Sequence, residues 1–197
     1  LKRFGKAEEC GEVAVFLAKN GYITGQGINI DGGMVMNEEE VMERRCVITG
    51  MGAVTPVGND VETTWENIKN GVNGMGYITK FDTEEFKVKI AGEVQNFNAE
   101  LYVDKKDLKR NDMFSIIAIA AAQQAFDMAG LVKEEIKEEE AERFGCIVGS
   151  GIGGFLTLEN QVSRVLEKGP GKISPLFIPM AILNMAAGNI SLKFGAK

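Results

Sequence analysis

Apolar residues recur at helical spacing in five stretches of the chain, and this spacing predicts five helices. The expected helices are residues 7–19, Asn59 to Gly71, Asp104 to Gly130, Thr157 to Lys168, and the apolar segment 175–194. The third is apolar nearly all round from Ile116 to Ala129, which is typical of a helix buried inside a domain.

Two of these helices carry a narrower apolar stripe that is expected to face the core. The helix after Asn59 should present Val61, Trp65 and Ile68 inward, and Asn59 with Glu62 has the spacing of a capping box. On the fourth helix the inward residues are expected to be Leu158, Val162, Val165 and Leu166.

Short apolar runs between the helices predict strands. Residues 45–49 and 144–148 each run into a glycine-rich turn, as buried strands of a parallel sheet do. Residues 86–90 alternate strictly, which indicates a half-exposed strand, and residues 22–30 alternate similarly. Strands alternating with helices indicate an α/β fold with a mostly parallel or mixed sheet.

Charge divides the chain into three parts. Glu38, Glu39, Glu40 and Glu43 make residues 37–44 an acidic stretch, which is interpreted as a solvated junction. Residues 1–36 before it predict one helix and one strand, too little to bury a core alone. Residues 45–197 after it hold the remaining predicted elements.

Composition excludes several kinds of chemistry. The 197 residues include no histidine, which excludes a Ser-His-Asp triad, a Cys-His pair and the common histidine zinc sites. Cys10, Cys46 and Cys146 form no close pair, so we expect neither a disulfide framework nor a metal site, and we expect Cys46 and Cys146 to be buried thiols.

Charge and hydropathy also bear on location. A net charge of −6 gives no indication of a nucleic-acid surface. Segment 175–194 is too interrupted by Pro179, Asn184, Gly188 and Asn189 to span a membrane, and no secretory signal pattern follows Leu1. The chain is therefore expected to be soluble and cytoplasmic, with no membrane or nucleic-acid partner.

The glycine turn Gly149, Gly151, Gly153 and Gly154 fits the G-x-G-x-x-G pattern that follows a strand in dinucleotide-binding domains. That pattern normally stands in the first βαβ unit, and here it comes late. The alternative is a tight packing turn in which glycine permits positive φ and close backbone approach. The packing turn is the favoured interpretation.

Two further segments are candidates for binding. Lys105, Lys106, Lys109 and Arg110 cluster where the long helix is expected to begin, either as a solvated face or as a docking patch for an acidic partner. Phe177 and Ile178 lie between Pro175 and Pro179, and such residues serve either a core or an apolar pocket.

Ordered strings along residues 45–197 resemble the amino-terminal half of the type II 3-oxoacyl-[acyl-carrier-protein] synthases, the condensing enzymes of bacterial fatty acid synthesis. The strings are residues 47–58 (VITGMGAVTPVG), 67–71, 86–92, 149–154 and 174–188.

Residues 1–36 resemble the carboxyl end of the 3-oxoacyl-[acyl-carrier-protein] reductases, through residues 1–6 and 22–34. The chain would then span a reductase–synthase junction, as a true fusion or an assembly artefact.

The resemblance implies the amino-terminal half of a layered, thiolase-like fold, preceded by a helix-strand remnant of a Rossmann-type reductase. It implies decarboxylative condensation of malonyl- and acyl-carrier protein to a 3-oxoacyl product, in a homodimer without a cofactor; NADPH belongs only to the complete reductase. It also implies that Lys106, Lys109 and Arg110 dock the acyl carrier protein, and that Ile152 and Phe177 line the acyl pocket.

In that family a cysteine takes the acyl group and two histidines assist malonyl decarboxylation. The resemblance places all three beyond Lys197, and none of the three cysteines present matches the nucleophile. We therefore expect this chain alone to be inactive. Two other hypotheses stay open: a non-catalytic partner similar to the chain-length factors of polyketide synthesis, and, through the glycine turn, a dinucleotide-binding module.

Overall fold

The structure is a computed structural model, which describes residues 6, 12–13, 15–16, 19 and 46–197. The chain divides into two compact units, Leu1–Val47 and Ile48–Lys197. In the first, all described positions between 12 and 19 are helical, as the sequence predicts. The predicted strand within 22–30, the acidic stretch 37–44, Cys10 and the boundary at residue 36 lie outside the described residues.

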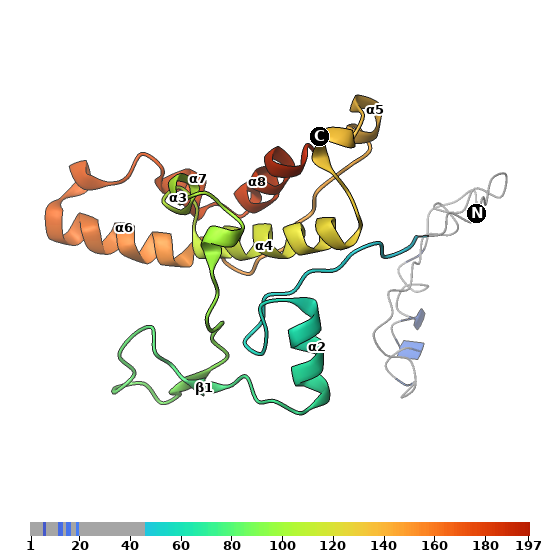
Figure 1. The fold of residues 1–197 in the computed structure, drawn as a ribbon. Helices are drawn as coiled ribbons and strands as arrows, with labels where there is room; N and C mark the ends of the chain where they lie inside the picture. Colours follow the sequence, from blue (N-terminus) through green and yellow to red (C-terminus); the bar gives the residue numbers. More distant parts are fainter. Residues whose placement is uncertain (1–5, 7–11, 14, 17–18, 20–45) are drawn as a thin grey trace. The chain divides into compact units, whose positions relative to one another are not determined.

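The second unit is mainly helical (Figure 1). Its longer helices are α2 (Val61–Lys69), α4 (Met113–Met128), α6 (Phe155–Lys168) and α8 (Asn184–Phe194). Its shorter helices are α3 (Lys105–Leu108), α5 (Glu138–Ala141) and α7 (Phe177–Ala181), with 3-10 turns η1 (Ala99–Leu101), η2 (Lys133–Glu135) and η3 (Pro170–Lys172). Its two strands are β1 (Gly76–Tyr77) and β2 (Ile90–Ala91).

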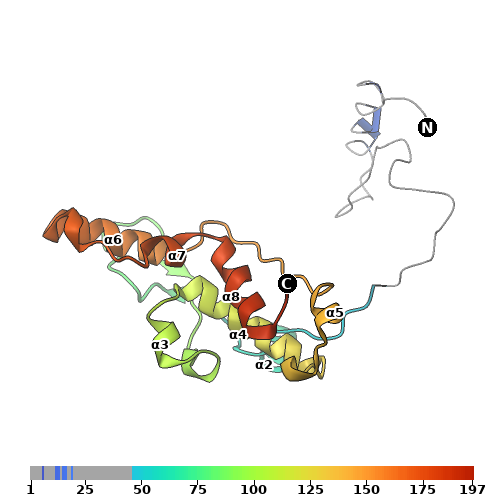
Figure 2. The same ribbon diagram turned by 90° about the horizontal axis from the view of Figure 1, so that it is seen from above.

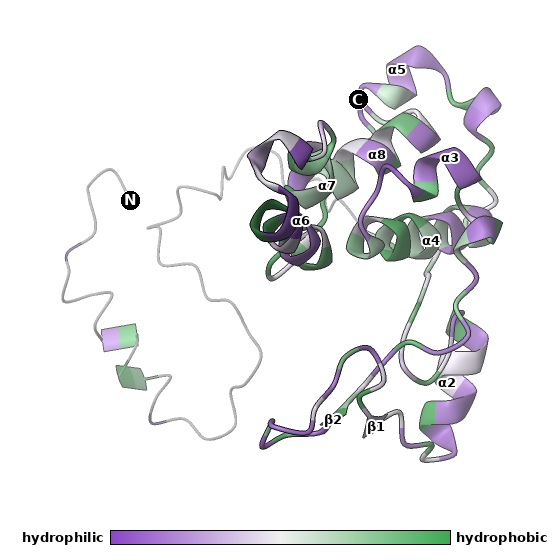
Figure 3. Ribbon diagram, turned by 90° about the vertical axis from the view of Figure 1, so that its left-hand side faces the viewer, coloured by the Kyte–Doolittle hydropathy of each residue, from purple (hydrophilic) through white to green (hydrophobic). Residues whose placement is uncertain are grey.

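The core lies between α4 and α8, which run side by side in both Figure 1 and Figure 2. Ile119 and Phe126 of α4 pack with Ile190 and Phe194 of α8, and all four are at least nine-tenths buried. The Phe126 and Phe194 rings lie 4.5 Å apart, centroid to centroid. Figure 3 shows α4 hydrophobic along most of its length. The buried helix predicted from Ile116 to Ala129 is confirmed as far as Phe126, and Asp127 and Met128 at its end are exposed.

The prediction of a single long helix from Asp104 to Gly130 is wrong, because this stretch forms two separate helices, α3 and α4. Asp112 stands at the break with extended backbone, and its carboxylate accepts the Phe114 amide proton as the N-cap of α4. An aspartate at this position ends the helical path of the preceding residues and satisfies a free amide of the next helix.

The two predicted buried strands do not form within the described residues. Ile48 is 82% exposed and Ile147 is 99% exposed, and neither segment is in a strand. The sheet in this part of the chain is a two-stranded antiparallel one, β1 with β2, so only the end of the predicted strand 86–90 pairs. A buried strand needs a neighbouring strand to bond with, and residues 46–197 supply none for these two runs; Phe144 at the start of the second bonds to Ala141 and Lys197, which are not in strands.

The inward stripes of α2 and α6 are also mostly exposed, contrary to prediction, and only Val61 and Val165 are half-buried. Trp65 is 58% exposed on α2 and Leu166 is 82% exposed on α6, while the buried residues of these helices are Thr64 and Thr157. α6 itself forms as predicted, with two more residues at its start. The N-cap of α2 is Asp60 rather than Asn59, with the Asp60 carboxylate accepting the Thr63 amide at 2.7 Å.

The apolar segment 175–194 forms two helices, α7 and α8, rather than one. No helix in the described part of the chain is long and apolar enough to cross a membrane.

Two glycines bring the segment before α2 into direct contact with α4. A Cβ on Gly52 would lie 1.8 Å from the carbonyl oxygen of Ala121, and one on Gly50 would lie 1.9 Å from that of Ala125. The side-chain oxygen of Gln124 accepts the Ala53 amide at 2.9 Å. Residues 50–53 are thus held against α4 by backbone packing that no larger residue permits.

Candidate functional site

The basic segment predicted as a docking patch lies on α3 and on the turn to α4. Lys106, Lys109 and Arg110 are all exposed, and none of them forms an ion pair within residues 46–197. Lys105 differs, since it lies 3.5 Å from Glu100. Three unpaired cations within five residues leave a positive surface available to an acidic partner.

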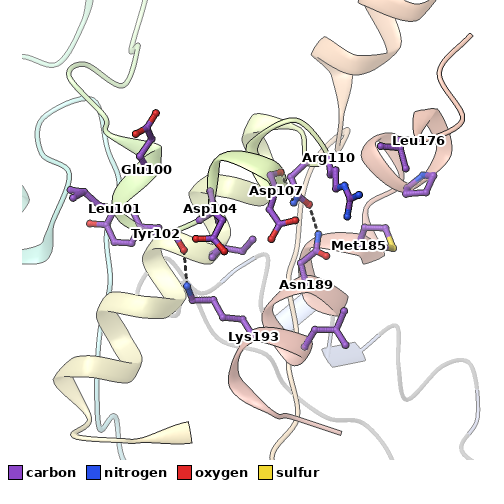
Figure 4. A pocket seen from close by; sticks show the side chains of 15 residues that line it. Glu100, Leu101, Tyr102, Asp104, Asp107, Arg110, Leu176, Met185, Asn189 and Lys193 are labelled. Atoms are coloured by element: carbon purple, nitrogen blue, oxygen red, sulfur yellow. Dashed lines mark hydrogen bonds between the residues drawn. The ribbon is translucent and has the colours of Figure 1, made fainter.

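A cleft of about 680 Å³ opens beside this segment (Figure 4). Arg110 lines it together with Leu176 and Pro179, so the structure brings the basic segment next to the proline-flanked segment. Lys193 of α8 faces the same cleft and donates to the carbonyl of Tyr102 at 2.6 Å. With Asp104, Asp107 and Glu100 also lining it, the cleft carries both signs of charge and selects no single ionic ligand.

The glycine turn is a close-packed connection into α6. Gly153 has a φ of +79°, and its amide donates to the Ser150 hydroxyl at 3.0 Å. The Gly154 amide donates to the Ala181 carbonyl at 3.0 Å, and a Cβ on Gly154 would lie 2.4 Å from the carbonyl oxygen of Met180. This geometry supports the packing-turn interpretation, because both reasons for glycine, positive φ and close approach, are present.

The two predicted acyl-pocket residues are not brought to one cavity. Phe177 lines an apolar groove of about 220 Å³ with residues of α6, among them Val162, Val165 and Leu166. Ile152 is 67% exposed in the glycine turn and lines neither this groove nor the larger cleft. The pocket assignment of the pair stays a prediction.

Asp112 makes a buried contact beside the basic segment that sequence reasoning missed. One carboxylate oxygen accepts both the backbone amide of Thr157 at 2.8 Å and its hydroxyl at 2.6 Å, which joins the start of α4 to the first turn of α6. Its position directly before the apolar run from Met113 is an N-cap signal that could have revealed the helix start. Its partner lies 45 positions away, and no local pattern identifies it.

Cysteine and acidic side chains offer no further chemistry here. Cys46 is exposed, contrary to prediction, and Cys146 is half-buried, where burial raises the pKa of its thiol above the ordinary value. A raised pKa disfavours the thiolate, the reactive form. Within residues 46–197 and the described positions before them, no group of three or more Cys, Asp or Glu could hold a metal ion.

Comparison with known families gives one match over most of the chain. The model described as "Beta-ketoacyl synthase, N-terminal domain" matches residues 43–197. The 3-oxoacyl-[acyl-carrier-protein] synthase 2 of Staphylococcus aureus (strain COL) is 50% identical over 154 residues, 78% of this chain and 36% of that protein. The protein of the same name from Synechocystis is 43% identical over 155 residues, with similar coverage. The chain thus spans about a third of the length of the curated relatives it matches.

Solved structures give the same picture for the fold. The ishigamide ketosynthase/chain length factor aligns with a TM-score of 0.67 at 27% identity, covering 76% of this chain and 37% of that one. A beta-ketoacyl synthase from Burkholderia phymatum aligns with a TM-score of 0.63 at 24% identity, covering 77% and 37%. A type II polyketide synthase ketosynthase, solved in complex with its acyl-carrier protein, aligns with a TM-score of 0.62 at 23% identity, covering 76% and 38%.

These similarities confirm the thiolase-like fold expected for residues 45–197. The family match begins at residue 43. The reductase remnant expected at 1–36 therefore stays a prediction.

Proposed function

This chain belongs to the beta-ketoacyl synthase family, and from that premise we propose that it is part of a condensing enzyme of fatty acid synthesis. The proposed reaction joins an acyl group to malonyl-carrier protein, with loss of CO₂, to give 3-oxoacyl-carrier protein. The observation that carries the proposal is the 50% identity over 154 residues to the Staphylococcus aureus synthase. The family needs no cofactor for this chemistry.

We propose that residues 1–197 alone do not condense substrates. The chain holds no histidine, and burial raises the pKa of the half-buried Cys146 thiol, which disfavours the reactive thiolate. The test compares this chain with a chimera in which residues 43–197 replace the matching segment of the Staphylococcus aureus synthase. We expect product only from the chimera. Product from the purified chain alone would contradict the inactivity, and a folded but inactive chimera would contradict the proposed enzyme.

The acyl carrier protein is the proposed partner, and it docks at Lys106, Lys109 and Arg110. Their exposure and their lack of ion pairs in the described residues support this, because carrier docking needs free positive charge. In the chimera, reversing all three charges to Glu should raise KM for carrier-bound substrates and flatten its dependence on salt between about 50 and about 300 mM.

Reversal of the exposed Lys87, Lys168 and Lys172 is the matched control, since it changes net charge equally at other places. An unchanged KM after the first reversal, or an equal rise after both, would reduce the basic segment to a solvated surface.

We keep Ile152 and Phe177 as the proposed acyl-pocket pair. Such a pocket would select acyl length by volume, since each methylene contributes only about 1–3 kcal/mol to discrimination. In the chimera, Ile152→Phe should leave kcat/KM for short acyl chains intact and lower it for long ones. A parallel loss for all lengths together with a lower Tm would show that Ile152 only fills space.

The second candidate function is a non-catalytic partner subunit, favoured by the structural similarity to a ketosynthase/chain length factor at 27% identity. This candidate differs from the enzyme in the nucleophilic cysteine that the resemblance places beyond Lys197. The sequence of the locus past Lys197 is therefore the test: a cysteine at that position supports the enzyme, and its replacement supports the partner subunit. Our proposal also includes a homodimer and a cytoplasmic location for the complete protein. Sedimentation of the chimera tests the first, and fractionation of cells with an antibody to residues 46–197 tests the second.

A further inference from the structure

Asp112 is a buried carboxylate without a cationic partner in the described residues. It is 5% exposed, and its contact Thr157 is 6% exposed. No lysine or arginine of residues 46–197 forms an ion pair with it. Burying a carboxylate in this way costs free energy unless hydrogen bonds within the protein replace those it made to water.

Two helix starts supply those hydrogen bonds. The Phe114 amide of α4 lies 3.3 Å from one carboxylate oxygen, and the amide and hydroxyl of Thr157 on α6 lie 2.8 and 2.6 Å from the other. Amides in the first turn of a helix have no partner within the helix, and the helix dipole favours a negative charge there. The carboxylate therefore fixes the first turns of α4 and α6 relative to each other.

This contact joins the two segments that carry the proposed site residues. Asp112 follows Arg110 by two positions, and Thr157 follows Ile152 by five. The two bonds from Thr157 are the only hydrogen bonds between segments 105–112 and 149–160 in the part of the chain that is described. The Leu158 amide bonds to the Gly154 carbonyl, so a shift of the first turn of α6 is transmitted to the glycine turn.

We propose that Asp112 is a positioning residue that couples carrier-protein docking at the basic segment to the ordering of the glycine turn. The coupling rests on the proposed docking function. A carrier protein bound to Lys106, Lys109 and Arg110 restrains the turn between α3 and α4, which strengthens the contact from Asp112 to Thr157. The tighter contact holds residues 149–154, and Ile152 with them, in one arrangement.

Hydrogen exchange of the 197-residue chain tests the coupling, with and without acyl carrier protein, on peptides covering residues 149–158. In the wild-type chain, carrier protein should slow exchange there by about tenfold, the scale of one charge-assisted hydrogen bond. Asp112→Asn removes the charge and one of the two acceptor oxygens, so it should reduce this slowing and leave the carrier affinity within about threefold, because the three cations are intact. Asp104→Asn, which removes a charge from the same segment without such a bond, is the matched control and should behave as wild type.

The outcomes separate the coupling from the docking. Equal slowing in Asp112→Asn and wild type, at equal affinity, overturns the coupling and leaves the docking intact. No carrier binding by wild type overturns the docking and the coupling with it. If Asp112→Asn does not fold, the pair Thr157→Val and Thr157→Ser decides: only the variant that keeps a hydroxyl should retain the slowing, and slowing in both overturns the coupling.

Discussion

The α4–α8 pair and the segments around α6 both carry large apolar side chains, and these side chains differ sharply in burial. Phe126 and Phe194 are 8% and 4% exposed, while Leu166 on α6 is 82% exposed and Ile147 just before the glycine turn is 99% exposed. In the first region each apolar face meets another within the described residues. In the second, α6 meets Phe177 of α7 along one apolar groove, and most of its apolar face stays exposed in the described residues.

The difference follows from how each element satisfies its backbone. A helix bonds its own amides and carbonyls, so α4 and α8 each form locally and then need only one another. An apolar strand depends on neighbouring strands for its hydrogen bonds as well as its burial. Hydrophobic pattern alone therefore predicts which residues should be covered, and partner availability decides whether they are.

Removing a large side chain from the α4–α8 core should have the largest effect on stability. Phe126→Ala should lower the free energy of unfolding by about 3–5 kcal/mol, because its ring packs against Phe194 and Phe144. Leu166→Ala on α6 should change it by no more than about 0.5 kcal/mol. Urea titration of the chain measures both. A comparable loss in both variants would mean that α6 is covered in solution, and a dependence of that loss on protein concentration would identify a second copy as the cover.

Adding one methyl group to the glycine turn should have the next largest effect. Gly154→Ala should cost about 1–3 kcal/mol, since its Cβ would lie 2.4 Å from the Met180 carbonyl oxygen and 2.7 Å from Cα of Ala181. Gly149→Ala in the same turn meets no atom within 4 Å and serves as the control, with a change under about 0.5 kcal/mol. Thermal and urea unfolding would disprove the close packing if the two variants were equally stable.

The N-cap of α2 should contribute less to the free energy of unfolding than the close packing at Gly154. Asp60→Ala removes a carboxylate that accepts both the amide and the hydroxyl of Thr63, and it should cost about 1 kcal/mol. Glu62→Ala tests the capping box expected from sequence and should cost under about 0.5 kcal/mol, because Glu62 is exposed and makes no capping bond in the structure. If the larger loss came from Glu62→Ala instead, the sequence-based cap would be the correct one.

The smallest effect is expected at Glu93, near the β1–β2 pair. The Thr79 hydroxyl, 2.7 Å from the Glu93 carboxylate, lowers the pKa of that carboxyl below its ordinary value of 4.5, and the Thr79 amide adds to the shift. A lowered pKa gives stability that is complete above pH 4.5 and is lost as pH falls through the folded-state pKa. Thr79→Val should raise the Glu93 pKa, measured by carboxyl NMR.

The loss of stability in Thr79→Val should be constant at neutral pH and shrink below pH 4.5. Thr83→Val, in the same loop without that hydroxyl contact, is the control. A Glu93 pKa that responds equally to both changes would contradict the assignment.

Sequence reasoning located α2, α4 and α6 because helical spacing and flanking caps or glycines are local signals. It joined α3 to α4 because it overlooked Asp112 as the local N-cap of α4, and it could not foresee the bond from Thr157 to Asp112, which spans 45 positions. It placed Trp65 and Leu166 facing inward because of their helical periodicity. Periodicity identifies the apolar face of a helix but does not show which other element, if any, covers that face. For the site, it identified the basic segment and the packing role of the glycine turn, and it had no means of linking them.

The close contact of Gly50 and Gly52 with the backbone of α4 limits which substitutions this protein can accept during evolution. The atoms that a new side chain would strike are the carbonyl oxygens of Ala121 and Ala125, which every amino acid carries. No replacement along α4 can therefore compensate for a larger residue at either glycine, and only a displacement of the helix could. Gly145 meets nothing within 4 Å and is free of this restriction. The backbone contact with α4 therefore fixes the two glycines and leaves the side chains of α4 to be constrained by other contacts, such as those of Ile119 and Phe126 in the core.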